Sequence, residues 1–360
     1  MMKSIDIYPT KGYLDRAVIV KDELVLQGWV APLQGDCPVD QFQVTFADQP
    51  LSNLNCTLGM PSEDVKKVYP DLKGADKARF EIRATLTPEQ QQQQQDVLIT
   101  ATPLVNGEAG TMLLNLIEPT LPLPPEEYIQ YIGGGFTNIG LEFLGYFIQR
   151  GVLRPSDRVL DVGCGIGRMA YTLAYYLNAQ GSYEGFDIHK PLIEVAAQTF
   201  GDRCRNFRFE HADIYNPMYN PESPVEAAEY RFPYPNERFN FVFLTSVFTH
   251  MRAPEVRQYL NEINRVMKPG SRCMIACFLL NPESESYIRL GKSTQNIVHK
   301  LEECFTSTLE VPEEAIGFKE PLLLEWISKR GFSVVGKYYG GWCGRPYLTS
   351  YQDILVLQKD

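Results

Sequence analysis

The feature that most constrains this chain is a short apolar run that ends in a glycine-rich turn. Residues 159–168 read Val-Leu-Asp-Val-Gly-Cys-Gly-Ile-Gly-Arg. We predict a buried strand, then a turn at Gly163, Gly165 and Gly167, and then a helix over 169–177. Glycine lets a ligand approach the backbone closely. A strand that passes through such a turn into a helix therefore indicates the ligand-binding corner of an α/β sheet.

Helix and strand patterns alternate from residue 126 to the end of the chain. The predicted strands 158–162, 183–187, 207–211, 239–245 and 272–278 alternate with predicted helices at 141–150, 169–177, 191–200, 254–267 and 320–330. Such alternation predicts a doubly wound, mostly parallel α/β sheet. The strands 332–339 and 352–358 have no helix between them, so we expect them to form an antiparallel hairpin. Residues 279–319 are predicted to be a helical insertion, part of a lid.

The amino-terminal part has a different pattern. Residues 1–118 contain short runs of alternating apolar and polar residues, separated by turn residues, which predict a small all-β, sandwich-like accessory domain. The glutamines at 90–95 are interpreted as a solvated loop or short helix between strands. Residues 119–125 form a proline-rich linker that cannot supply a central strand. We therefore place the second domain at 126–360.

Composition excludes several classes of protein. The chain has 360 residues, 34 Lys and Arg, 44 Asp and Glu, and a net charge of −10, which disfavours nucleic acid as a partner. No apolar run is long enough for a membrane span, and the amino terminus has no signal-like apolar segment. The 8 cysteines form no C-x-x-C pair and do not cluster with histidine. We therefore expect reduced thiols, a cytoplasmic location and no metal site.

The turn does not have the residues that bind a pyrophosphate. Arg168 stands where a dinucleotide fingerprint needs its third glycine, and no P-loop lysine is present. Instead, acids lie at the ends of three consecutive strands: Asp161 two residues before the turn, Asp187 after the second strand, and Asp213 after the third. An acid at the second strand tip can bind a ribose diol. These acids favour a nucleoside ligand that carries a cationic amino acid.

Residues 126–360 resemble the class I S-adenosylmethionine-dependent methyltransferase family. The carriers of the resemblance are V-L-D-V-G-C-G-I-G-R (159–168), Y-E-G-F-D (183–187), H-A-D-I (211–214), the strand 239–245 with its following loop, and R-V-M-K-P-G-S (265–271). The sequence departs from the family pattern at Asn240 and Ser271. The resemblance implies a seven-stranded, Rossmann-like sheet with a reversed last strand. It also implies S-adenosylmethionine as cofactor, bound by Asp161, Gly163, Cys164, Gly165, Gly167, Asp187, Ile188, Asp213, Ile214 and Thr245, with Gly134 and Phe136 in an amino-terminal cap.

The acceptor would lie at the carboxyl ends of the strands. His250 follows the fourth predicted strand, and it is either a general base or a packing residue. Tyr230 and Tyr234, in a long proline- and tyrosine-rich segment at 216–238, either line a substrate wall or only pack. Trp342 and Arg345, between the last two strands, either contact a substrate ring or anion or only pack the hairpin loop. The glycines at 133–135 allow a mobile flap or form a plain joint.

The combined expectation is an S-adenosylmethionine-dependent methyltransferase that acts on a small-molecule or glycan acceptor. Thr-Ser-Val-Phe at 245–248 replaces the Asn/Asp-Pro-Pro-Tyr signature of amino methylation, which favours an oxygen acceptor. Residues 24–46 are weakly similar to β-sandwich modules of bacterial glycan-modifying enzymes, and that module either contributes to a homodimer or covers the catalytic domain. Two alternatives stay open: a non-catalytic nucleotide-binding scaffold, and an NAD-dependent oxidoreductase.

Overall fold

The computed structural model describes residues 7–35, 37–217, 219–346 and 350–360. The chain forms two compact units. Unit 1 comprises Met1–Pro122, Gly135–Gln149 and Tyr171–Tyr176, and unit 2 comprises Leu123–Gly134, Arg150–Ala170 and Leu177–Asp360. Within the described part of the chain, no helix is both long enough and apolar enough to cross a membrane.

Unit 1 contains two antiparallel sheets that contribute to one hydrophobic core. The first sheet has the order β1-β2-β6-β5, and the second has the order β4-β3-β7-β8, with β9 paired to β7. The Phe42 ring from the second sheet lies 4.6 Å from the Phe80 ring of the first. The elements are β1 (Thr10–Val20), β2 (Glu23–Pro32), β3 (Gln41–Phe46), β4 (Gln49–Pro50), β5 (Asn55–Met60), α1 (Glu63–Val68), η1 (Ala75–Lys77), β6 (Arg79–Thr85), α2 (Pro88–Gln92), β7 (Val97–Val105), β8 (Glu108–Ala109), β9 (Leu113–Ile117) and α4 (Phe136–Gln149).

The first glutamines of the run form the end of a short helix, as one of the two predicted alternatives has it. In α2, the hydroxyl of Thr87 accepts from the backbone N–H of Gln90, and the Gln90 side chain accepts from the N–H of Thr87. This reciprocal capping box satisfies two helix-terminal donors, so a polar run with little to bury still has a defined start. The helix α4 packs on β9, where Gly145 leaves room for the side chain of Leu114.

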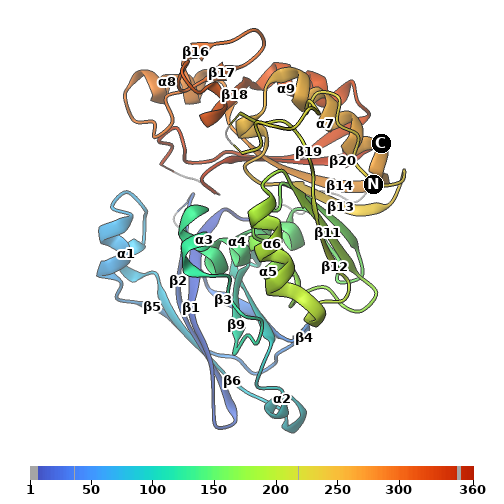
Figure 1. The fold of residues 1–360 in the computed structure, drawn as a ribbon. Helices are drawn as coiled ribbons and strands as arrows, with labels where there is room; N and C mark the ends of the chain where they lie inside the picture. The colour runs from blue at the N-terminus through green and yellow to red at the C-terminus, as the bar shows by residue number, and fades with distance from the viewer. Residues whose placement is uncertain (1–6, 36, 218, 347–349) are drawn as a thin grey trace. The chain divides into compact units, whose positions relative to one another are not determined.

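Unit 2 is built on a mixed sheet, and the predicted α/β class is confirmed. Its order is β12-β11-β10-β13-β14-β20-β19, drawn in green to red in Figure 1. The first five strands pair in parallel, whereas β20 is antiparallel to both β14 and β19. The strands are β10 (Arg158–Val162), β11 (Ser182–Asp187), β12 (Phe207–His211), β13 (Phe239–Leu244), β14 (Met267–Cys277), β19 (Phe332–Tyr338) and β20 (Asp353–Lys359).

Helix α7 buries one apolar face in the core of this unit. In α7, Val256, Leu260 and Ile263 follow the helical spacing of one face and are fully buried in the main core. The helices and short turns of the unit are α3 (Glu126–Tyr131), α5 (Arg168–Leu173, whose last three residues belong to unit 1), α6 (Lys190–Phe200), η2 (Gly201–Arg203), η3 (Phe248–His250), α7 (Ala253–Val266), α8 (Pro282–Arg289), η4 (Pro312–Glu314) and α9 (Glu320–Ser328).

The insertion at 279–319 is not mainly helical, so that prediction is wrong. It contains α8 and a small sheet of order β15-β18-β17-β16, formed by β15 (Leu279–Leu280), β16 (His299–Lys300), β17 (Phe305–Thr306) and β18 (Ile316–Lys319). Short strands with Gly and Pro around them carry little period-2 signal. Tertiary pairing, such as Leu279 with Phe318, therefore decides their structure.

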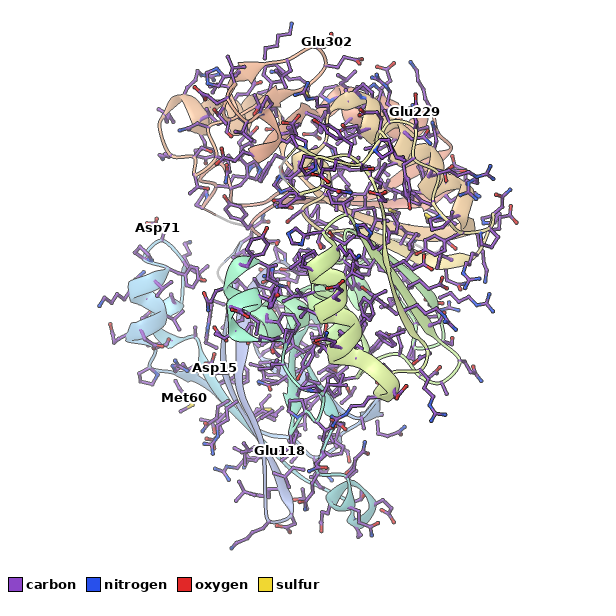
Figure 2. All side chains as sticks on the ribbon, viewed as in Figure 1. Asp15, Met60, Asp71, Glu118, Glu229 and Glu302 are labelled. Carbon is purple, nitrogen blue, oxygen red and sulfur yellow. The ribbon has the colours of Figure 1, made fainter. Side chains whose placement is uncertain are left out.

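The acidic net charge of the chain is carried at its surface. The side chains of Asp15, Asp71, Glu118, Glu229 and Glu302 are labelled in Figure 2, and all of them are exposed. Burial of an unpaired carboxylate would cost several kcal/mol, so exposed positions are where most acids belong.

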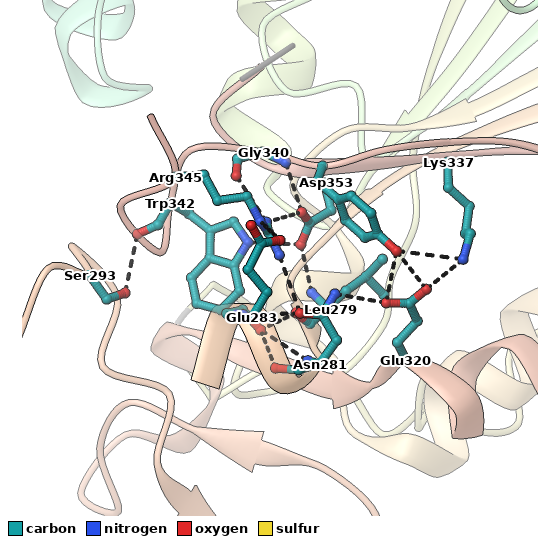
Figure 3. A network of polar contacts seen from close by, with 12 residues as sticks. Leu279, Asn281, Glu283, Ser293, Glu320, Lys337, Gly340, Trp342, Arg345 and Asp353 are labelled. Atoms are coloured by element: carbon teal, nitrogen blue, oxygen red, sulfur yellow. Dashed lines mark hydrogen bonds and ion pairs between the residues drawn. The ribbon is translucent and has the colours of Figure 1, made fainter. Parts of the chain in front are cut away.

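A few carboxylates are buried, and one of them joins the last hairpin to the insertion (Figure 3). Asp353 is fully buried at the start of β20. Its Oδ2 accepts from the N–H of Leu279 at 2.8 Å and from Nε1 of Trp342 at 2.7 Å. Its Oδ1 accepts from the N–H of Gly340 at 2.7 Å and from Arg345 at 3.0 Å. Four donors together replace the water that this carboxylate loses on folding.

We predict that Arg345→Met destabilises the fold by about 3–5 kcal/mol, because it leaves the Asp353 charge buried without its cation. The free energy of unfolding from urea denaturation measures this. The matched control is Lys329→Met, which removes an ion pair with Glu325 in which the two side chains are 68% and 53% exposed. That control should change stability by less than about 1 kcal/mol. Equal losses in the two variants would contradict the assignment.

Candidate functional site

The glycine turn follows β10 and folds back on the neighbouring strand. The backbone N–H groups of Gly163 and Cys164 both donate to the carbonyl of Phe186, at 2.9 and 3.1 Å. Gly163, Gly165 and Gly167 have φ angles of +80°, +53° and +81°, which L side chains rarely adopt. The turn at the three predicted glycines is thus present, and its conformation explains why glycine stands at each of them.

The three glycines meet different surroundings. A Cβ at Gly163 would lie 2.4 Å from the Val247 side chain, and one at Gly167 would lie 2.7 Å from the Phe200 ring. A Cβ at Gly165 would meet nothing within 4 Å. Gly163 and Gly167 are therefore needed for packing, whereas Gly165 leaves backbone open to a ligand.

Asp187 is held at this open backbone. Its Oδ2 accepts from the N–H of Gly165 at 2.8 Å, and its Oδ1 accepts from the N–H of His189 at 2.8 Å. Burial raises the pKa of the Asp187 carboxyl, and the two backbone hydrogen bonds oppose that rise. Each carboxylate oxygen can accept a further hydrogen bond. The carboxylate is thus fixed in direction and still able to bind a pair of hydroxyls.

Asp161 is buried below the turn with half of its carboxylate unused. Its Oδ2 accepts from the Tyr183 hydroxyl at 2.7 Å, whereas its Oδ1 has no partner among the described residues. Burial, together with a smaller contribution from the charge of Asp187, raises the pKa of Asp161 to about 8. An unpaired carboxylate oxygen beside a second acid favours a cationic ligand group.

Tyr183 is a site residue that the sequence analysis missed. A Cβ at Gly185 would lie 2.7 Å from the Tyr183 hydroxyl and 2.9 Å from Cβ of Cys164. Gly185 therefore makes room for the hydroxyl that binds Asp161. The Tyr-Glu-Gly spacing in the second strand is the only signal, because it alternates an aromatic and a glycine on one face.

Cys164 carries no signal of reactivity. It is buried, and its Sγ lies 3.9 Å from the carbonyl oxygen of Gly165. Burial raises the pKa of this thiol well above its ordinary value. A thiol in this state is not a nucleophile at neutral pH.

Arg168 secures the glycine segment before α4. Its guanidinium donates to the carbonyls of Ile132 at 2.6 Å and Gly134 at 2.9 Å. Gly133 and Gly134 have φ angles of +87° and +70°. The segment predicted as a mobile flap is therefore tethered here by two charge-assisted hydrogen bonds.

The other predicted cofactor residues have different environments. Asp213 is exposed, and its Oδ1 accepts from Asn220 at 2.9 Å, which lowers the pKa of its carboxyl. Ile214 is buried in the main core, and Ile188 packs against it. Thr245 is half-buried and lies directly after β13. Phe136 belongs to unit 1, and its ring lies 5.4 Å from the ring of Tyr171 in that unit.

The loop after β13 carries the predicted base. In the turn η3, the N–H of His250 donates to the carbonyl of Val247 at 2.9 Å. Nδ1 of His250 lies 2.8 Å from the carbonyl oxygen of Glu313 in the insertion. A carbonyl only accepts, so Nδ1 carries the proton and the lone pair of the neutral ring is on Nε2. This is the tautomer that a general base at Nε2 requires.

A second polar contact holds the same loop. Ser246 has a φ of +60°, and its Oγ accepts from Nε2 of Gln352 at 2.9 Å. Thr249 is buried with no partner for its hydroxyl among the described residues. The loop is therefore held by contacts from both the insertion and the last hairpin.

Three of the four predicted substrate residues are buried, and the fourth, Tyr230, is half-buried. Tyr234 is buried with its ring edge-on to Phe239, and Tyr230 packs against the main core. Trp342 and Arg345 are buried in the Asp353 cluster described above. The burial of Tyr234, Trp342 and Arg345 fits the packing alternative named for each of them, and for Tyr230 both alternatives stay open.

No group of three or more metal-binding side chains that could hold an ion occurs in the described ranges. The candidate site consists of the carboxylates of Asp161 and Asp187 at an open glycine turn. His250, whose tautomer is defined, lies on the loop after β13.

Comparison with known proteins shows which proteins the chain is similar to. The sequence profile described as "Methyltransferase domain" matches residues 153–326. The chain is 30% identical over 122 residues to the 2-phytyl-1,4-naphtoquinone methyltransferase of Synechococcus elongatus, covering 34% of this chain and 46% of that protein. It is 30% identical over 133 residues to an O-methyltransferase of Pyrenophora dematioidea, covering 36% and 43%. The chain thus spans less than half the length of these relatives.

Among solved structures, a SAM-dependent methyltransferase from Aquifex aeolicus matches with a TM-score of 0.43 and 16% identity. The match covers 66% of this chain and 100% of that one.

We predict that Asp161→Asn makes the protein more stable relative to wild type as pH rises. The folded-state pKa of Asp161, about 8, lies above its unfolded value of about 4, so the folded state binds the extra proton between these values. The wild-type free energy of unfolding therefore falls as pH rises through this window, by at most about 1.4 kcal/mol per pH unit from this group. Urea denaturation of both proteins from pH 5 to 9 measures the difference. Parallel pH profiles would refute the assignment.

Proposed function

Because residues 153–326 belong to the class I S-adenosylmethionine-dependent methyltransferase family, we propose that this chain transfers a methyl group to a small-molecule or glycan hydroxyl. S-adenosylmethionine is the cofactor of the family. The observation that carries the proposal is the pair of carboxylates, Asp161 and Asp187, at an open glycine turn. Two acids repel a pyrophosphate and attract a cation.

The residues at the turn fit the chemistry of this cofactor. The Asp187 carboxylate, oriented by Gly165 and His189, has free lone pairs for the two ribose hydroxyls. The open side of Gly165 leaves room for close approach to the backbone. A cationic amino acid portion beside the unpaired Oδ1 of Asp161 would lower the pKa of this carboxyl and so favour its negatively charged form.

When bound, the cofactor supplies an electrophilic methyl group on a sulfonium, so the protein's task is alignment and proton removal. Alignment of two reactants can contribute roughly 7–11 kcal/mol. The Val247 side chain lies against Gly163, so the loop after β13 packs on the glycine turn. His250, three residues further on, lies on the loop that adjoins the turn.

We assign His250 as the general base for the acceptor hydroxyl. Its Nδ1–H donates to the Glu313 carbonyl, so Nε2 presents the lone pair. When Nε2 takes the proton, both ring nitrogens become donors, and the same carbonyl stabilises the charged ring. The similarity to a naphtoquinone methyltransferase and to an O-methyltransferase supports a small-molecule acceptor, and the second of these relatives supports an oxygen nucleophile.

The accessory role of the β-sheet unit is part of the same proposal. Its similarity to modules of glycan-modifying enzymes supports a sugar hydroxyl as acceptor. The alternative is that the unit forms a homodimer contact or covers the catalytic unit. The cytoplasmic location that we propose rests on the scattered cysteines instead. Transfer of label from methyl-labelled S-adenosylmethionine into host extract, followed by mass spectrometry of the product, tests the function. Absence of any labelled small molecule or glycan would refute it.

We predict that Asp187→Asn weakens binding of S-adenosylhomocysteine at least tenfold, because an amide replaces one acceptor oxygen of the diol site with a donor. Isothermal titration calorimetry measures the affinity. The control Asp202→Asn changes an exposed acid in η2, and its affinity should equal that of wild type. An unchanged affinity in Asp187→Asn would remove its assigned role.

We predict that His250→Ala lowers the rate of methyl transfer about 10²–10⁴-fold with little change in cofactor affinity, because it removes the base but no cofactor contact. Single-turnover label transfer and calorimetry separate the two quantities. His299→Ala is the matched control, since His299 is exposed in β16, away from the glycine turn in the sequence. Full activity of His250→Ala would show that its ring only packs.

A further inference from the structure

One residue of the insertion, Glu313 in the turn η4, makes two polar contacts with the loop after β13. Its backbone carbonyl accepts from Nδ1 of His250 at 2.8 Å, and its carboxylate accepts from Nε of Arg252 at 2.7 Å. All three residues belong to unit 2. Because His250 and Arg252 are two residues apart, Glu313 contacts the same short stretch with its main chain and with its side chain.

The ion pair between Glu313 and Arg252 is partly buried. The Glu313 side chain is 11% exposed, whereas that of Arg252 is 51% exposed. Nε and Nη2 of Arg252 both lie 2.7 Å from Oε1 of Glu313. A carboxylate that loses most of its water needs such charge-assisted hydrogen bonds to replace it. The guanidinium therefore holds the Glu313 side chain in one direction.

Arg252 is in turn held at the start of α7. Its backbone N–H donates to Oε2 of Glu255 at 2.6 Å. Burial raises the pKa of the Glu255 carboxyl, and the charge of Glu313 contributes in the same direction. The two acids are thus close enough to repel one another, and the Arg252 cation offsets this repulsion. Without the cation, the Glu313 carboxylate would turn away from this loop.

The carbonyl of Glu313 determines where the His250 ring carries its proton. In a neutral histidine ring, the hydrogen bond made by one nitrogen decides which nitrogen is protonated. Here Nδ1 is protonated, and Nε2 is neither hydrogen-bonded within the described residues nor a buried atom. If the carbonyl moved away, the proton could transfer to Nε2. A neutral ring protonated there has no lone pair on the open side.

We propose that Glu313 is a positioning residue for His250, an inference that rests on the proposed function. The ion pair of its carboxylate with Arg252 holds its carbonyl on Nδ1, and the carbonyl keeps the lone pair on Nε2. Glu313 itself touches neither acceptor nor cofactor in this scheme and acts only through the ring. The insertion thereby determines whether the base is in its reactive form.

The first test observes the tautomer of His250 directly and needs no acceptor molecule. Long-range ¹H–¹⁵N spectra distinguish the two tautomers at about pH 8.5, where an ordinary histidine is neutral. The chain has 4 histidines, so the signal that disappears in His250→Ala identifies this ring. Wild type should carry the proton on Nδ1. Glu313→Gln, which keeps the carbonyl but removes the charge, should carry it partly on Nε2.

The matched control is Glu303→Gln. Glu303 also lies in the insertion and pairs with an arginine of α7, Arg257, but no hydrogen bond joins either residue to His250 within the described ranges. This control should keep the wild-type tautomer. Arg252→Lys retains the cation and should keep it too, whereas Arg252→Met should behave like Glu313→Gln. The double variant should lose no more than either single variant, because both act through one contact.

The second test measures methyl transfer. Glu313→Gln should lower the single-turnover rate of label transfer into host extract by about 10–10²-fold, because displacement of a catalytic group can cost about 10²-fold. The affinity for S-adenosylhomocysteine by calorimetry should not change, since no cofactor contact is removed. Glu303→Gln should keep the wild-type rate. Thermal melting of every variant checks that the fold is retained.

The outcomes separate this inference from the proposed function. A changed tautomer with slower transfer in Glu313→Gln and Arg252→Met, but not in Glu303→Gln, supports the positioning role. If wild type transfers label while Glu313→Gln keeps the wild-type tautomer or the wild-type rate, the positioning role is overturned and the proposed function stands. A wild-type ring protonated on Nε2 also overturns the positioning role. If wild type transfers no label, the proposed function fails and this inference fails with it.

Discussion

The hydrogen bond from the N–H of Gly165 to Asp187 is the contact on which the site depends. It joins the turn after β10 to the tip of β11, so two strand ends become one rigid corner. A side chain other than glycine at 165 would need a φ of +53°, and it would also fill the open space beside the backbone. The carboxylate and the turn therefore each determine the position of the other, and a ligand meets a site formed before it binds.

The parts of the site that sequence could predict are those set by strand order. The acids at 161 and 187 follow from a parallel sheet, because the carboxyl ends of neighbouring strands lie at one edge. The alternation of strands and helices was likewise sufficient to predict the α/β fold class. Sequence could not show that Asp353 would take Trp342 and Arg345 as partners, since that pairing joins residues across a hairpin and an insertion. Nor could it show the short strands of the insertion, which pair only through tertiary contacts.

Tyr219 and Tyr234 illustrate why a segment rich in proline and tyrosine is hard to interpret from sequence. Both lie in the proline- and tyrosine-rich stretch, yet Tyr234 packs in the core while Tyr219 is exposed beside His189. The difference comes from the loop that Asn216 and Asn220 close and from the bond of Asn220 to Asp213. Such contacts depend on the third strand's position, which no local pattern of prolines and tyrosines contains.

The insertion at 279–319 orients the candidate base. The carbonyl of Glu313 sets the tautomer of His250, and the carboxylate of the same residue pairs with Arg252, two residues after that histidine. Glu313 thus holds this loop at two points, the His250 ring and the Arg252 side chain. The insertion is itself held to the last hairpin through Leu279 and Asp353. The orientation of the histidine therefore depends on the folding of the insertion, and a change far along the chain at the Asp353 cluster can reach the candidate base through a continuous path of backbone and hydrogen bonds.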